Sequence, residues 1–140
     1  MNYIDCVGLI VVENRKLLLA FSKNKKAWYL PGGKVDAGES GVSALQREIK
    51  EELNMELAAE ELQWYYYITA PAFGEQQLLM KQHCYRYELR QVPQPTSEIE
   101  AIHYFSLAEY RKETHQVPGV LLAFAKLQED GLVDGDPAGV

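Results

Sequence analysis

The chain has 140 residues, of which 47% are hydrophobic and 24% are charged, and its formal net charge is −6 at pH 7. That length suits one domain with a proper hydrophobic core, and the composition is ordinary for a soluble globular protein. The acidic balance argues against a nucleic-acid polymer as partner, because a phosphate backbone selects basic surfaces. A phosphate-bearing small molecule stays compatible with it, since a bound metal ion can invert the local field.

The N-terminal residues carry no pattern of export or of membrane insertion. The start lacks the basic residues of a signal peptide, and the apolar run Val7–Val12 is far shorter than the roughly 20 residues of a membrane helix. The two cysteines, Cys6 and Cys84, lack metal-ligand spacing and are interpreted as free buried thiols. We therefore expect a cytoplasmic protein with no membrane partner.

In chain order, the predicted elements are strands, one central helix, further strands and a last helix. Runs rich in β-branched and aromatic residues predict strands at Tyr3–Val12, Leu17–Phe21, Trp28–Leu30, Trp64–Ala70, Leu78–Arg90 and Ala101–Phe105. Helical spacing predicts helices at Gly41–Leu53, with Ser40 as N-cap, and at Val117–Glu129, with a helical turn at Leu107–Lys112. This order favours an α/β fold in which helices cover both faces of a mixed β-sheet, an α/β/α sandwich.

The sequence predicts one domain over residues 1–130, and a flexible tail rich in Gly and Asp over residues 131–140. Pro31-Gly32-Gly33 is a loop signal. The basic loop Ser22–Lys26 and the Gly-centred loop Phe73–Gln77 are candidates to face a ligand, although solvent-exposed turns are the simpler and favoured interpretation of both.

The central helix carries an unusual group of carboxylates. Glu48, Glu51 and Glu52 are spaced i, i+3, i+4, so they line one flank of the helix, where like charges repel. A hard divalent cation with oxygen ligands would offset that repulsion. An apolar stripe lies next to this flank and consists of Val42, Leu45, Ile49 and Leu53. The helix can therefore pack on a core and hold its carboxylates at the rim of a cleft.

The stretch from residue 33 to residue 55, GKVDAGESGVSALQREIKEELNM, has a fixed spacing: Gly33, five residues, Glu39, seven residues, then Arg47-Glu48. It resembles the signature of the Nudix hydrolases, the MutT-like family, at every position but one. The family usually has glycine where this chain has Asn54. The departure is mild, because that position follows the helix and asparagine is the second choice after glycine in the left-handed conformation.

The resemblance implies the same α/β/α fold and a metal-dependent pyrophosphohydrolase that cleaves a phosphoanhydride bond in a nucleoside diphosphate linked to another group. It implies Mg²⁺, or Mn²⁺, as the cofactor and a small nucleotide or nucleotide derivative as the substrate. The implied metal ligands are the Gly32 carbonyl, Glu48, Glu51 and Glu52. Arg47 would hold a glutamate in place by charge-assisted hydrogen bonds. The implied substrate-binding residues are Gly33, Lys34 and Glu39.

The catalytic set that we predict is Glu48, Arg47, Glu52 and Glu98. A base must take a proton from water, and Glu48 and the distant acids Glu98 and Glu100 all stay open for that role. We favour Glu98, because it lies in the loop proper, whereas Glu100 lies closer to a strand. Phe21 and Trp28 flank the expected cleft, and either could stack on a base.

A nucleoside triphosphate, including an oxidised one, is the first candidate substrate, and a nucleotide sugar or a dinucleotide polyphosphate is the next. The alternative is a non-catalytic Nudix-fold module that binds a nucleotide or has a regulatory role. The intact carboxylate set favours the enzyme, since a binding module has no need for three mutually repelling glutamates. A homodimer is compatible with the sequence.

Overall fold

The computed structural model describes residues 2–75 and 77–135 of the chain. The strands are β1 (Asn2–Ile10), β2 (Val12–Glu13), β3 (Lys16–Ser22), β4 (Ala27–Tyr29), β5 (Gly32–Lys34), β6 (Gln63–Pro71), β7 (Leu78–Arg86) and β8 (Ile99–Phe105). The helices are α1 (Gly41–Leu53), α2 (Leu107–Tyr110) and α3 (Pro118–Glu129), with a 3₁₀ turn, η1, at Ala59–Glu61.

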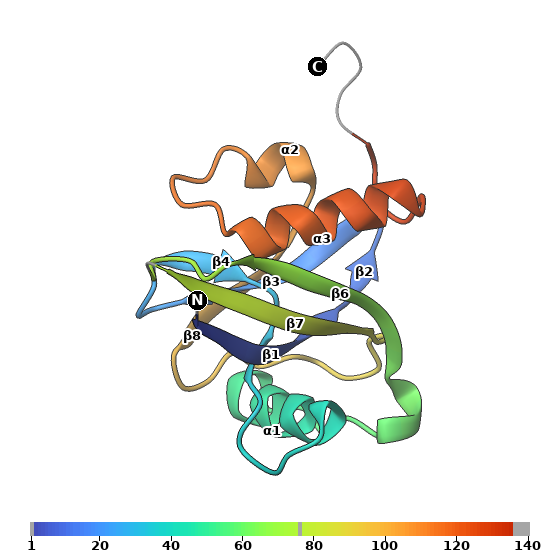
Figure 1. The fold of residues 1–140 in the computed structure, drawn as a ribbon. Coiled ribbons are helices and arrows are strands. Elements are labelled where there is room, and N and C mark those ends of the chain that lie inside the picture. Colours follow the sequence, from blue (N-terminus) through green and yellow to red (C-terminus); the bar gives the residue numbers. More distant parts are fainter. Residues whose placement is uncertain (1, 76, 136–140) are drawn as a thin grey trace.

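The strands form two sheets between layers of helices (Figure 1). The first sheet has the order β5-β1-β7-β6, in which β1 and β7 are parallel and the other neighbours antiparallel. The second contains β2, β3 and β4, with β8 paired to β3. Helix α1 lies on one side of the strands, and α2 and α3 lie on the other. The predicted α/β/α sandwich with a mixed sheet is confirmed.

Each helical layer covers its own hydrophobic core. Beneath α1, the predicted stripe residues Leu45, Ile49 and Leu53 are fully buried with side chains of β1 and β3. Beneath α3, Phe124 and Leu127 are fully buried in the other core. Burial of a side chain of this size is worth about 1.5–3 kcal/mol, so these two cores hold α1 and α3 against the strands.

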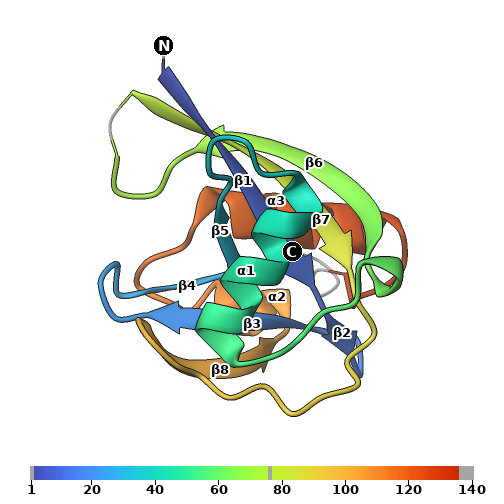
Figure 2. The same ribbon diagram turned by 90° about the horizontal axis from the view of Figure 1, so that it is seen from below.

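The caps of α1 follow the sequence closely. The Ser40 hydroxyl accepts a hydrogen bond from the Ser43 N–H at 3.0 Å, and Asn54 ends the helix with φ 54° and ψ 41°. This is the left-handed conformation that was expected where the family usually has glycine. Figure 2 shows α1 lying across β5 and β1, so the fixed helix ends also fix its acidic flank relative to β5.

Three sequence predictions of local structure were wrong. The strand predicted at Tyr3–Val12 divides, because β1 ends at Ile10 and Val12 belongs to β2 of the second sheet. The strand predicted at Leu78–Arg90 ends at Arg86, the last residue paired in the ladders with β1 and β6, although the Tyr87 N–H still donates to the Ile10 carbonyl at 3.0 Å. The segment from Gly32 is a short edge strand, β5, rather than a loop, and it pairs antiparallel with β1. A strand at this position places backbone, rather than side chains, in front of α1.

The chain stays packed beyond α3. Val133 is buried, and Arg15 Nη2 donates to the Val133 carbonyl at 2.9 Å. The packed part therefore extends past residue 130, where the sequence placed the start of a flexible tail, and residues 136–140 of that tail lie outside the described residues. Within residues 2–75 and 77–135, the structure contains no helix of the length and hydropathy needed to cross a membrane.

Candidate active site

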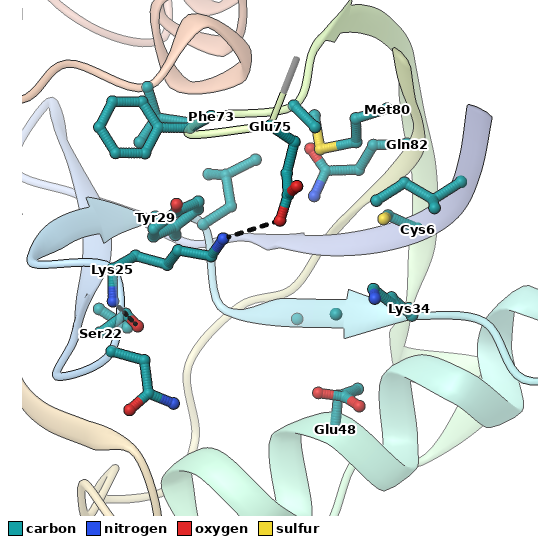
Figure 3. A pocket seen from close by; sticks show the side chains of 18 of the residues that line it. Cys6, Ser22, Lys25, Tyr29, Lys34, Glu48, Phe73, Glu75, Met80 and Gln82 are labelled. Carbon is teal, nitrogen blue, oxygen red and sulfur yellow. Dashed lines mark hydrogen bonds and ion pairs between the residues drawn. The ribbon is translucent and has the colours of Figure 1, made fainter. Parts of the chain in front are cut away.

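A cavity of about 500 Å³ lies beside β5 and is lined by residues of α1, of strands from both sheets and of the loops between them (Figure 3). One end is acidic and contains Glu48, Glu52 and Glu98. The other end, away from Glu48 in Figure 3, contains Tyr29, Phe73, Met80 and Gln82, with the charged residues Lys25 and Glu75 beside them; Leu30 and Val117 also line the cavity. A cavity with these two ends suits an elongated ligand that is charged at one end and flat and apolar at the other.

The backbone of Gly32 and Gly33 comes unusually close to its neighbours. A Cβ on Gly33 would lie 2.3 Å from Glu48 Oε2, and a Cβ on Gly32 would lie 2.1 Å from the Val7 carbonyl oxygen. Gly32 also has φ +142°, which side-chain-bearing residues rarely adopt. The absence of side chains at both positions therefore lets β5 lie directly against β1 and against the carboxylate of Glu48.

The direction of the Gly32 peptide groups follows from the ladder. The Leu9 N–H donates to the Pro31 carbonyl at 2.8 Å. Because bonded and non-bonded pairs alternate along an antiparallel ladder, Gly32 turns its N–H and its carbonyl away from β1. The N–H donates to Glu52 Oε1 at 3.0 Å. The Gly32 carbonyl thus points away from β1 at the acidic end of the cavity.

Glu52 is the most deeply buried of the carboxylates on α1, with only 7% of its surface exposed. Burial raises its pKa to about 8, the Gly32 N–H opposes the rise, and the charges of Glu48, Glu98 and Glu51 add to it. In the absence of a cation, Glu52 therefore holds a proton near neutral pH.

Arg47 holds the other carboxylates. It forms two hydrogen bonds with Glu39, both of 2.9 Å, and its Nη1 donates to Glu48 Oε1 at 2.7 Å. The hydrogen bonds from Arg47 lower the pKa of Glu39 to about 2. Burial nevertheless leaves the pKa of Glu48 raised, although Arg47 opposes that rise. Arg47 also donates to the Lys34 carbonyl at 3.0 Å, so one guanidinium links α1 to the end of β5.

The predicted metal ligands share one chemistry but are not gathered into a cage. Within residues 2–75 and 77–135, no three His, Cys, Asp or Glu side chains are grouped so as to hold a metal ion. Glu48 is bound by Arg47, and the Glu51 side chain is 54% exposed and lies 3.6 Å from Arg47. All the candidate donors are oxygens, as Mg²⁺ and Mn²⁺ prefer. The mutual repulsion that raises the pKa of Glu52 is one that a cation would relieve, so the residues fit a divalent ion.

The structure separates the two distant acids. Glu98 lines the cavity, and Asn24 Nδ2 donates to its Oε2 at 2.9 Å. The hydroxyl of Ser22 lies 3.5 Å from the same oxygen. Glu100 lies on β8, is exposed, and is not among the residues that line the cavity. The loop before β8 thus brings Glu98, and not Glu100, to the carboxylates of α1.

The remaining predicted site residues divide into those that line the cavity and those that do not. Gly33 and Lys34 line the cavity. Glu39 does not, and it instead accepts hydrogen bonds from Arg47 and from the Asp36 N–H, the latter at 2.8 Å. Neither Arg47 nor Glu51 lines the cavity. The structure therefore places Glu39 and Arg47 behind the acidic end, where they brace the turn before α1.

Both loops that were candidates to face a ligand reach the cavity. Lys25 precedes β4 and Glu75 follows β6; both line the cavity, and their side chains form an ion pair of 3.3 Å (Figure 3). Phe73 from the second loop lies near Tyr29, with ring centroids 6.2 Å apart. The simpler interpretation of these loops is thus replaced by one in which they meet across the cavity.

Sequence reasoning missed most of the apolar end. Phe21 and Trp28, the aromatic residues that were expected to flank the cleft, pack on each other at 5.2 Å and do not line the cavity. Tyr29, Phe73 and Gln82 line it instead. They come from three separate parts of the chain, and only the alternation of residues along β4 could have indicated Tyr29 in place of Trp28.

Comparison with known proteins agrees with this geometry. Residues 3–123 match a family model described as "NUDIX domain". The chain therefore belongs to the Nudix family, as the signature predicted.

Two relatives are similar over part of the chain. The human "8-oxo-dGDP phosphatase NUDT18" is 36% identical over 62 residues, which are 43% of this chain and 19% of that protein. A Bacillus subtilis (strain 168) protein, provisionally named an 8-oxo-dGTP diphosphatase, is 46% identical over 44 residues, which are 31% of this chain and 30% of that protein. The matched segments thus span less than a third of either relative.

A solved structure is similar over nearly the whole length. The MutT NUDIX hydrolase of Burkholderia pseudomallei has a TM-score of 0.75 at 22% identity, and the match covers 91% of this chain and 99% of that one. At this identity the likeness establishes the fold alone.

Proposed function

We propose that this enzyme hydrolyses a nucleoside triphosphate to a monophosphate and pyrophosphate, with 8-oxo-dGTP and dGTP as the first substrates to test. The observation that carries the proposal is the two-ended cavity: carboxylates and glycine backbone at one end, aromatic and apolar side chains at the other. The names of the human and Bacillus relatives, which cite 8-oxo-dGDP and 8-oxo-dGTP, support an oxidised guanine nucleotide.

Glu48, Glu51, Glu52 and the Gly32 carbonyl would hold Mg²⁺ or Mn²⁺. When bound, the ion neutralises phosphate charge and acidifies water. The protein's own contribution is positioning. Gly33 brings backbone to the phosphate chain. Arg47 restrains Glu48, and a cation would compete with that contact.

Glu98 is the proposed general base. It is a carboxylate at the acidic end that is not on α1, and its hydrogen bond from Asn24 orients the side chain toward the cavity. From there it can take a proton from an attacking water. Lys34 lines the cavity and brings positive charge to a ligand whose phosphates would otherwise meet mainly carboxylates, whereas the charge of Lys25 is paired with Glu75.

A metal-supplemented panel of nucleoside triphosphates, nucleotide sugars and dinucleotide polyphosphates tests the proposal, with separate assays for phosphate and pyrophosphate. Pyrophosphate release from a triphosphate is expected, and EDTA should abolish it. Tight nucleotide binding without turnover of any member would instead favour the alternative, a non-catalytic module. A single domain, cytoplasmic location and a homodimer remain predictions, and sedimentation at several concentrations tests the last.

A further inference from the structure

Gln82 on β7 is a largely buried polar side chain that lines the cavity. Among the described residues, the buried polar or charged ones are Ser22, Glu52 and Gln82. Ser22 and Glu52 each accept a backbone hydrogen bond, from Lys25 and Gly32. The side-chain carbonyl of Gln82 lies 3.9 Å from the Cys84 thiol, whereas its Nε2 has no hydrogen-bond acceptor within the part of the chain that the structure describes. Among the described residues, the fully buried side-chain atom without a partner is the Tyr104 hydroxyl and not this amide nitrogen, so Nε2 is open to the cavity and can donate to a ligand there.

The amide lies at the apolar end of the cavity. Gln82 lines that end beside Met80, and only 7% of its surface is exposed (Figure 3). A Cβ on Gly8 would lie 2.8 Å from Nε2, so the glycine of β1 leaves the space that this amide occupies. Tyr29 and Phe73 line the same cavity. The surroundings therefore place the Gln82 amide beside aromatic walls that suit a flat ring, while Lys25 in the same cavity is paired with Glu75.

We propose that Gln82 is a specificity-determining residue whose Nε2 donates to an oxo group at the edge of a purine, and so selects a 6-oxopurine over a 6-aminopurine. This rests on the proposed function for the nucleotide, with the phosphates at the carboxylate end. An amino group at that edge would place donor against donor and leave both unpaired, and such mismatches commonly cost tenfold to a hundredfold or more in kcat/KM.

The matched pair of dITP and dATP tests the inference, because the two bases differ at the 6-oxo and 6-amino edge. The ratio of kcat/KM for dITP to that for dATP is expected to exceed about 10 in the wild type and to fall to about 1 in Gln82→Leu. In Gln82→Glu, the acceptor should invert the preference. Gln63→Leu is the control, since Gln63 is exposed on the neighbouring strand β6 and does not line the cavity. Leucine fits the apolar surroundings, and the Tm of each variant reports its fold.

A metal-free binding measurement separates this inference from the proposed function. Deoxyinosine and deoxyadenosine bear no phosphate for the carboxylates to repel, so both can be titrated by NMR in EDTA while the Gln82 amide resonance is followed. Tighter binding of deoxyinosine, lost in Gln82→Leu, supports the inference even if no triphosphate is hydrolysed. Equal or absent binding of the two nucleosides, or an unchanged preference in Gln82→Leu, overturns it, even if hydrolysis by the wild type is rapid.

Discussion

Replacing Glu52 with glutamine tests how the buried carboxyl group of this residue affects the pH dependence of stability, separately from its effect on hydrolysis. Glu52 is buried, accepts a hydrogen bond from the Gly32 N–H, and faces the charges of neighbouring carboxylates. The amide of Glu52→Gln keeps the shape and can accept the same hydrogen bond, but it carries no proton to lose. The substitution is therefore expected to leave the fold intact and to change how stability depends on pH.

The magnitude follows from the pKa. In the folded state it is raised from 4.5 to about 8. Between these values the folded protein keeps a proton that the unfolded chain releases, so the free energy of unfolding falls as pH rises. Because the ordinary pKa is 4.5, most of the loss occurs between pH 5 and 8. For one such group, the fall from pH 6 to pH 8 is about 2 kcal/mol.

Urea unfolding in EDTA at pH 6 and pH 8 measures this quantity. The wild type is expected to lose about 2 kcal/mol more than Glu52→Gln does over the same interval. Glu51→Gln is the matched control, since Glu51 lies on the same helix with its side chain 54% exposed. It should keep most of the wild-type pH dependence, because the charge of Glu51 is the smallest of the contributions to the raised pKa of Glu52. An equal pH dependence in the wild type and Glu52→Gln would refute the reasoning.

The same variant has a kinetic consequence. Loss of a metal ligand should lower hydrolysis at saturating magnesium by on the order of a thousandfold. Added Mg²⁺ should also raise the stability of the wild type at pH 8 more than that of Glu52→Gln, because only the carboxylate gains a counter-ion. A folded Glu52→Gln enzyme with near wild-type turnover would contradict the assignment of Glu52.

The other predictions concern positions around the cavity and the end of α1. Glu98→Gln should lower kcat by roughly a hundredfold, leave KM nearly unchanged and flatten the acid limb of the pH–rate profile. Glu100→Gln should change neither kcat nor the pH–rate profile. Equal small effects of the two substitutions would instead assign the role of general base to Glu48. Gly33→Ala should lower kcat/KM at least tenfold while Tm shows a folded protein, because its Cβ would lie 2.3 Å from Glu48 Oε2; wild-type activity would show that this carboxylate is free to move. Asn54→Gly should change the free energy of unfolding by no more than about 1 kcal/mol. Glycine adopts φ 54° without the steric strain of a side chain, and this gain offsets the loss of the exposed hydrogen bond from Asn54 to Gln94 at 3.1 Å. A larger loss of stability in urea unfolding would assign the Asn54 side chain a further role.

Features that depend on near neighbours in the chain could be predicted from the sequence. The bounds of α1, its Ser40 cap and the left-handed Asn54 follow from local spacing and from intrinsic backbone preferences. The burial of Leu45 and Ile49 beside an exposed Glu51 follows from helical periodicity. These signals need no knowledge of the tertiary structure, and they sufficed to predict the helix that carries Glu48 and Glu52 to the cavity.

The apolar end could not be predicted, because it is assembled by pairing between distant strands. Gln82 reaches the cavity only because β7 lies parallel to β1, with Cys6 opposite Gln82 in the ladder. Phe73 meets Tyr29 through a loop contact between residues that are 44 positions apart in the sequence. The end of β7 at Arg86 is likewise set by where its partner strands end.

Product analysis with and without metal tests the central claim, that carboxylates on α1 support phosphoanhydride hydrolysis, most directly. The wild type and Glu52→Gln would be incubated with dGTP or 8-oxo-dGTP in Mg²⁺ or EDTA, and nucleoside monophosphate and pyrophosphate would be quantified by ion-exchange chromatography. We predict equal amounts of the two products from the wild type in Mg²⁺, and almost none in EDTA or from Glu52→Gln. Wild-type turnover that persists in EDTA, or that Glu52→Gln retains in full, would contradict the account.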